Sequence, residues 1–460
     1  MNINLPTLTD FLQHISTVNE PFILKNNGQP PLWSDESFHQ SFYTQNPEQY
    51  ALLALIDRAK PAQQIRMLFT LLQRSRAGMP KAMRQTLERV TDVLLTILHP
   101  DSILTIFLAL RRVRANHKHT TRAILKYILN HPQFEDLALR RRPAVVDALE
   151  HALGKNTAQG AIKKLGGADE NSANLPHKFL RKTCQAVKVQ AVLPYLYRPP
   201  VGQGLIPPVG DIQYTLVHSK ATEVFEKKQE RPKTITATNR GDISAILVHL
   251  YRGGYSEELQ KSLEGSVQAA SAELPNFSGK VALVLDASAS TRSYGDREFC
   301  VLAQSVALKL ILEKCCQNLQ VYSVGGSGEL PIPEGPTDLA TALLDALEEK
   351  PDLVIIISDG YENLYPGDLA RVVAALPLLG LQTPIVFCHS KFTDRDDLSL
   401  RRPAANLPQL EFWHQDDFSE LLLHLFSRVA GGLGEQCLRE FLLRKLDSLE
   451  KELTLWTASN

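Results

Sequence analysis

The chain has 460 residues and a hydrophobic content of 44%, which is enough for two or three globular domains with buried cores. Its apolar runs are shorter than the roughly 18 residues of a membrane helix. The N-terminus lacks the basic start and apolar stretch of a secretory signal. We therefore expect a cytoplasmic protein that does not span a bilayer. Six cysteines without Cys-x-x-Cys spacing are expected to be free thiols.

The net charge of zero conceals a strong asymmetry along the chain. Residues 58 to 200 hold 25 Lys and Arg against 9 Asp and Glu, a net charge of +16. Residues 281 to 460 hold 15 against 26, a net charge of −11. This distribution indicates either a polyanionic partner for the basic part or attraction between the two parts.

Apolar residues recur at three- and four-residue spacing from about residue 49 to 191, which is typical of amphipathic helices. Proline recurs where helices would begin, because it fits the first turn and disrupts the interior. These prolines are Pro61, Pro80, Pro100, Pro132 and Pro143. The pattern predicts an all-α, HEAT-like helical repeat domain over 49–275, after an N-terminal segment 1–48. Residues 194–215, rich in Pro and Gly, are predicted to be extended and packed along the helices.

From residue 280 onward, strands alternate with helices. Continuous apolar runs predict buried strands at 281–286, 320–324, 353–358 and 384–389. Amphipathic stretches lie near 296–317, 338–349, 366–379 and 416–428. This alternation predicts a doubly wound α/β domain over 280–460, with ligands at the carboxyl ends of its strands.

Oxygen-bearing side chains follow the predicted strands. Asp286, Ser288 and Ser290 leave the first strand in the sequence Asp-Ala-Ser-Ala-Ser. Thr337 begins a helix in a second loop, and Asp359 follows the strand at 353–358. An oxygen-only set suits a hard cation, preferably Mg²⁺, although Mn²⁺ and Ca²⁺ remain open. A serine-rich turn that merely caps a helix, with an empty site, is the alternative.

These residues resemble the metal-ion-dependent adhesion site (MIDAS) of von Willebrand factor A domains. The resemblance implies direct ligation by Ser288 and Ser290, ligation partly through water by Asp286 and Asp359, and either mode for Thr337. It also implies an open coordination position for a partner's carboxylate, which makes the domain a docking module. Because no nucleophile and base accompany the motif, we expect no enzymatic activity.

Basic residues of the helical part form clusters that are candidates for RNA binding through phosphate and shape. They are Arg111, Arg112, Arg114, His117, Lys118, His119, Arg122, Arg140, Arg141, Arg142, Lys163, Lys164, Lys178, Arg181 and Lys182. Any single cluster is also explained by cations that balance a helix dipole. A net charge of +16 exceeds what that role requires.

The lead-in over 243–290, with the later Ser-Asp-Gly-Tyr-Glu-Asn and Gln-Thr-Pro-Ile-Val-Phe-Cys-His-Ser segments, resembles the Ro autoantigen (TROVE-type) family. The resemblance covers about 240–400 in sequence and only architecture and charge over the N-terminal helices. It implies a ribonucleoprotein component that binds structured small noncoding RNA and carries a Mg²⁺ docking site. A protein adaptor without RNA binding, for example a partner of a MoxR-type ATPase, is the alternative, and an RNA-processing enzyme is a third.

Overall fold

The computed structural model describes residues 7–25, 28–131, 137, 140–159, 242–254, 256–391, 401–429 and 432–458. The chain divides into two compact units, which are Met1–Lys227 with Leu446–Asn460 (unit 1) and Lys228–Lys445 (unit 2). The two helices before the sheet, which the sequence assigns to the helical domain, belong to unit 2 and pack against its helix Cys300–Cys315. No helix of the described residues is both long and apolar enough to cross a membrane.

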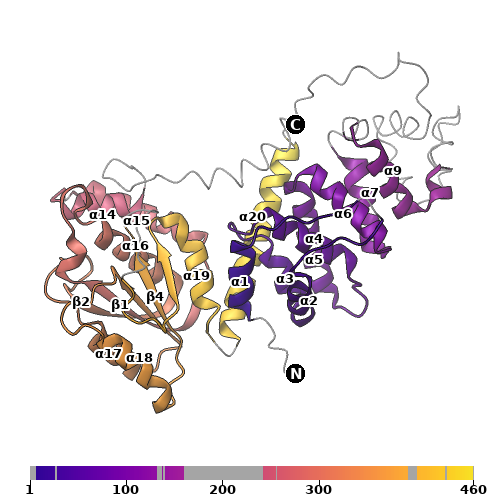
Figure 1. Ribbon diagram of the computed structural model, residues 1–460. Coiled ribbons are helices and arrows are strands. Elements are labelled where there is room, and N and C mark those ends of the chain that lie inside the picture. The colour runs from indigo at the N-terminus through magenta and orange to yellow at the C-terminus, as the bar shows by residue number, and fades with distance from the viewer. Residues whose placement is uncertain are drawn as a thin grey trace. The chain divides into compact units, whose positions relative to one another are not determined.

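Unit 1 is helical in its described parts (Figure 1). Its helices are α1 (Leu8–Thr17), α2 (Glu36–Gln45), α3 (Pro47–Leu53), α4 (Pro61–Gln73), α5 (Lys81–Ile97), α6 (Pro100–Arg112), α7 (Lys118–Asn130), α9 (Arg142–Leu153) and the end of α20 (Leu433–Ala458). Helix α4 packs against α5 and α6, and α9 packs against α6 and α7. The helical class is thus confirmed, while a HEAT-like repeat stays a prediction.

Proline marks helix starts in unit 1, as the sequence predicts. Pro61, Pro100 and Pro143 lie in the first turns of α4, α6 and α9, and Pro80 is the N-cap of α5. Proline is tolerated there because the first-turn N–H groups have no partner within the helix. Pro132 and the predicted extended segment 194–215 lie outside the described residues.

Unit 2 contains a five-stranded, fully parallel sheet in the order β2-β1-β3-β4-β5. The strands are β1 (Phe277–Ala287), β2 (Cys316–Gly325), β3 (Leu353–Ser358), β4 (Ile385–Ser390) and β5 (Gln409–Phe412). The four predicted strands are all present. The fifth was missed because Gln-Leu-Glu-Phe is short and lacks an apolar run.

Helices cover both faces of this sheet (Figure 1). The helices of unit 2 are α14 (Ile243–Tyr251), α15 (Glu257–Ala272), α16 (Cys300–Cys315), α17 (Leu339–Glu348), α18 (Asp368–Ala375), α19 (Phe418–Phe426) and the beginning of α20, and α14 and α15 pack against α16. Side chains alternate between faces, so that Val284 and Ile356 join the core beneath α17 and α18. Helices α16 and α19 contact the sheet as well, and β1 and β3 are buried on both faces.

The start of α14 is held by Asp242, whose side chain caps the helix by accepting a hydrogen bond from Ser244 N at 2.8 Å. The second carboxylate oxygen lies 3.2 Å from His414 Nε2, and both side chains are buried. Burial opposes the charged imidazole, but Asp242 and Asp416 outweigh it and raise the pKa of His414 to about 9. A buried ion pair therefore joins α14 to the segment after β5.

We expect Asp242→Asn to keep the cap and break the ion pair, because asparagine caps helices as well as aspartate does. The free energy of unfolding should fall by about 1–3 kcal/mol at pH 7. Since the folded-state pKa of His414 is raised, this stabilisation is present at low pH and is lost as the pH rises through about 9. Urea unfolding across this range measures the difference. Asp416→Asn changes the more exposed acidic partner of His414, so it should lower the free energy of unfolding less than Asp242→Asn does. If Asp242→Asn lowered the free energy of unfolding as much at pH 10 as at pH 7, the assignment of the ion pair would be contradicted.

Candidate metal centre

The order of the strands places a topological switch point between β1 and β3. The chain leaves β1 for β2 on one side, whereas β3, β4 and β5 follow on the other side. Leu285 and Ile357 are paired in register, so the two strands end side by side. Loops diverge at such a switch point, which is where doubly wound sheets bind ligands. Asp286 and Asp359 stand at these two strand ends.

Three hydroxyl groups meet beside these carboxylates. Thr337 Oγ1 donates to Ser288 Oγ at 2.7 Å, and Ser288 Oγ lies 3.0 Å from Ser290 Oγ. Ser290 also hydrogen-bonds to Asp359. Ser288 and Thr337 are fully buried. The structure thus brings together all five residues that the sequence proposed as ligands, from three separate loops.

The two carboxylates carry unfavourable negative charge in the absence of a cation. Asp286 accepts hydrogen bonds from Ser358 Oγ at 2.6 Å and Ser288 N at 3.0 Å, yet burial still raises its pKa. Burial, together with the charge of Asp286, raises the pKa of Asp359 to about 6. No basic side chain of the described residues forms an ion pair with either carboxylate. Arg401 donates to the backbone oxygen of Asp359 at 3.5 Å, and its charge lowers the pKa of that carboxyl only in part, so the site still favours a cation.

Two residues that sequence reasoning missed hold the ligand loops in place. Ser358 donates to Asp286, as described above, and follows directly from the end of β3. His389 Nε2, on β4, donates to the backbone oxygen of Asp359 at 2.7 Å, while its Nδ1 accepts from Gln409. Burial lowers the pKa of His389 to about 4, so the ring is neutral. The only signal for His389 was its place at the end of a predicted strand.

Gly360 lets the backbone turn immediately after Asp359. Its φ is +84°, and a Cβ atom there would lie 2.7 Å from the backbone oxygen of Arg401. A residue with a side chain would be strained at this φ, and its Cβ atom would displace the backbone of Arg401. The glycine thus positions Asp359 through the backbone.

The predicted RNA-binding residues are placed differently, because many of them join helices of unit 1. Arg141 pairs with Asp101 at 2.6 Å, and Arg111 pairs with Asp147. Others of this set contact acidic or backbone groups, namely Arg112 with Lys25 O and Gln29 O, and Arg122 with Glu88. Surface pairs of this kind stabilise by up to about 1 kcal/mol each.

Arg114 and Lys118 are exposed and form no ion pair with the described residues. His117 and His119 stack with ring centroids 5.5 Å apart, and burial helps lower the pKa of His119 to about 4, which leaves it neutral. Lys163, Lys164, Lys178, Arg181 and Lys182 lie outside the described residues.

No protein-family model matches the chain, and no curated protein matches it in sequence. Among solved structures, the crystal structure of the Deinococcus radiodurans Ro (RSR) protein is similar to it at 11% identity, over 89% of this chain and 98% of that chain. The TM-score is 0.34, which is too low to show a common fold. This likeness therefore assigns neither a family nor a function.

We expect Asp359→Asn to stabilise the metal-free protein, because the variant removes one of two buried, mutually repelling charges. At pH 8 in EDTA the free energy of unfolding should rise by about 1–3 kcal/mol. The gain should vanish as the pH falls below about 6, where wild-type Asp359 is protonated in the folded state. Denaturant unfolding measures this, with Asp345→Asn, an exposed acid on α17, as control. A less stable Asp359→Asn variant at pH 8 would refute the reasoning.

Proposed function

We propose that unit 2 binds a divalent cation, preferably Mg²⁺, through Asp286, Ser288, Ser290, Thr337 and Asp359. The observation that carries this proposal is the meeting of two buried carboxylates and three hydroxyls without a basic ion-pair partner among the described residues. Oxygen-only donors are those that Mg²⁺ prefers. A bound cation would favour the ionised form of both carboxylates, which burial disfavours and, for Asp359, the charge of Asp286 disfavours further.

We propose that this cation serves docking, as in von Willebrand factor A domains. When bound, it would offer a coordination position to a carboxylate of a partner protein. Exposed apolar side chains come from the same three loops: Tyr294 is 88% exposed, Ile332 71% and Tyr361 47%. Exposed large apolar side chains beside a binding site are common at interaction surfaces. They support a protein partner that presents an acidic residue among apolar ones.

The proposed role is binding rather than catalysis. Among the described residues, the hydroxyls of Ser288 and Thr337 are hydrogen-bonded to other hydroxyls and to no histidine. The nearest buried imidazole, that of His389, is committed to a backbone oxygen and to Gln409. An activated nucleophile needs a base within hydrogen-bond reach, and this arrangement provides none for these two groups.

Mg²⁺ should raise the melting temperature of the EDTA-stripped protein, because a ligand that binds only the folded state stabilises it. At a concentration about 100 times the dissociation constant, the gain is about 2.7 kcal/mol. Asp286→Asn should abolish the Mg²⁺-dependent shift. Asp338→Asn is the matched control, since Asp338 neighbours Thr337 but its carboxylate caps α17 through Thr341 N. Differential scanning fluorimetry separates these cases, and an equal shift in Asp286→Asn would exclude the site.

RNA binding by unit 1 is the second candidate, in a Ro-like role. It rests on charge, because residues 58–159 hold 18 Lys and Arg against 7 Asp and Glu. Acidic partners account for some of these cations, yet a net excess of 11 remains over this range. Arg114 and Lys118, at the turn between α6 and α7, are exposed to a polyanion. Phosphate contacts by such residues bind RNA without reading its sequence.

Changing Arg114 and Lys118 together to alanine should weaken binding of a structured stem-loop RNA about tenfold. It should also reduce the slope of log affinity against log salt by roughly 1–2, as expected for two lost phosphate contacts. Filter binding across a salt series measures both quantities. Lys314→Ala, at an exposed lysine of unit 2, is the control. Absence of wild-type binding at physiological salt would favour the adaptor, for which a MoxR-type ATPase is an example of a partner.

A further inference from the structure

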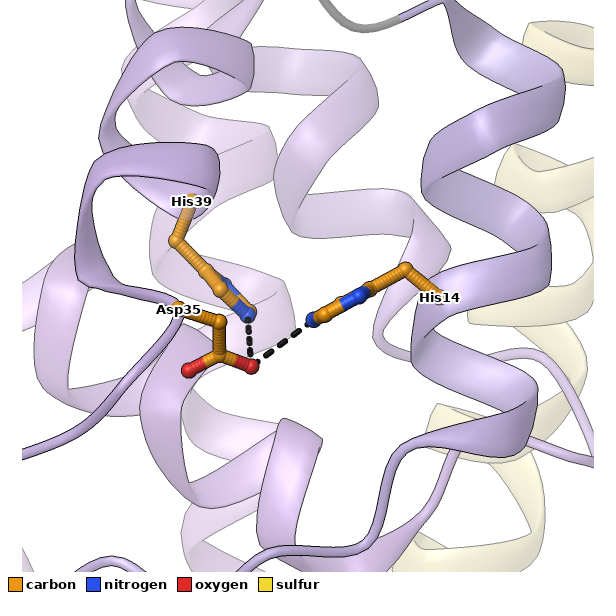
Figure 2. Close-up of side chains that lie close together, drawn as sticks. All are labelled: His14, Asp35 and His39. Carbon is orange, nitrogen blue, oxygen red and sulfur yellow. Dashed lines mark hydrogen bonds and ion pairs between the residues drawn. The ribbon is translucent and has the colours of Figure 1, made fainter.

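A second group of metal-binding side chains lies in unit 1 and is independent of the site between β1 and β3. Figure 2 shows His14 on α1, Asp35 before α2 and His39 on α2 pointing toward one point. One ligand atom from each lies within 4.8 Å of the other two. We propose that these three residues bind Zn²⁺.

The separations suit a zinc site that needs only small adjustments. His14 Nε2 lies 2.7 Å and His39 Nε2 3.6 Å from the same oxygen of Asp35 (Figure 2). Ligand atoms about 2.1 Å from a tetrahedral zinc lie roughly 3.4 Å apart. Two imidazoles and one carboxylate are moreover ligands that zinc accepts, whereas Mg²⁺ and Ca²⁺ favour oxygen.

Asp35 stands at the N-cap position of α2 but does not cap the helix with its side chain. The carboxylate instead presents one oxygen to the two histidines and pairs its other oxygen with Arg66 Nε at 2.8 Å. Aspartate at an N-cap usually accepts from the helix. Here that stabilisation is given up, and the carboxylate is oriented as a ligand that binds through one oxygen.

His39 is held in the orientation that a ligand requires. The ring is fully buried, and its Nδ1 lies 2.8 Å from the hydroxyl of Tyr50, so that Nε2 faces Gln63 and Asp35. Ligating histidines are commonly fixed in this way by a partner on the other ring nitrogen. With Nε2 bound to the ion, Nδ1 would carry the proton and donate it to the hydroxyl of Tyr50, which can accept. Burial lowers the pKa of His39, which keeps the ring in the neutral form that binds metals.

A fourth donor and an entry path are also present. Gln63 Oε1 lies 2.7 Å from His39 Nε2, while its amide nitrogen donates to Val18 O and Asp35. The amide oxygen therefore stands beside the proposed ion. The side chain of His14 is 19% exposed, so the metal can enter from this side.

The charge of Arg66 does not exclude the cation. Arg66 neutralises Asp35, so the protein would supply no net charge to the ion. Sites with three neutral histidines are equally uncharged and bind Zn²⁺, with ionisation of a bound water restoring part of the balance. Arg66 also donates to the backbone oxygens of Glu20 and Ala62, which keeps it on the far side of the carboxylate.

The consequence of binding is structural. Zinc would cross-link α1 to the start of α2, and Gln63 and Arg66 would tie both to α4. It would thereby close the segment between His14 and Asp35, in which the described residues include one isolated bridge, between Ile23 and Leu32. Zinc binding should accordingly stabilise unit 1.

The test is titration of the EDTA-stripped full chain with Zn²⁺ against a competing chelator, in excess Mg²⁺. Wild type should bind one equivalent, with a matching rise in melting temperature. His14→Ala should weaken this binding at least tenfold, and it should fold because His14 is partly exposed. Co²⁺ should give the visible absorption of a tetrahedral complex in wild type and lose it in the variant.

Two controls separate this proposal from its alternatives. His249→Ala, at an exposed histidine of unit 2, should bind Zn²⁺ as wild type does. Asp286→Asn should also bind Zn²⁺ normally, so failure of the site between β1 and β3 would leave the zinc result intact. Wild-type affinity in His14→Ala, or no stoichiometric Zn²⁺ binding in wild type, would show that the three residues form only a hydrogen-bonded network.

Discussion

The electrostatic repulsion between Asp286 and Asp359 is the constraint around which unit 2 is organised. It exists because β1 and β3 are adjacent and parallel, so their last residues deliver two carboxylates to one buried place. Hydroxyls and backbone N–H groups surround them, but none of these contributes positive charge. The protein bears this cost between β1 and β3, whose neighbouring positions Val281–Leu285 and Leu353–Ile357 are apolar and buried. Such a local conflict is typical of a functional site.

Unit 1 handles charge in the opposite way, by pairing it. Asp35 is compensated by Arg66, and several surface cations connect neighbouring helices through acidic partners. Much of the basic character thus has a structural use, and only its excess is available to a polyanion. The candidate basic clusters therefore contain both cations paired with acidic groups, such as Arg141, and exposed cations without an ion pair among the described residues, such as Arg114 and Lys118.

The elements with strong local patterns could be predicted closely. Strand β3 matches its predicted bounds, and the five proposed ligands meet, since their strand context was sufficient to place them at one edge. Strand β5 could not be found because its four residues owe their conformation to pairing with β4. His389 and the group around Asp35 were missed for a related reason, because their hydrogen-bond partners are distant in sequence. Asp359 is 30 residues from His389, and Gln63 is 24 residues from His39.

The sequence by itself determined the helical and α/β classes, the helix starts at proline and the choice of oxygen-bearing side chains as candidate ligands, because these depend on periodicity and residue chemistry over short spans. Only the tertiary structure decided that α14 and α15 pack against α16, that Arg141 is paired, and that His14, Asp35 and His39 converge. The physical reason is common to all three. Each depends on contacts between distant segments, whose formation is governed by packing of the whole unit rather than by any local pattern.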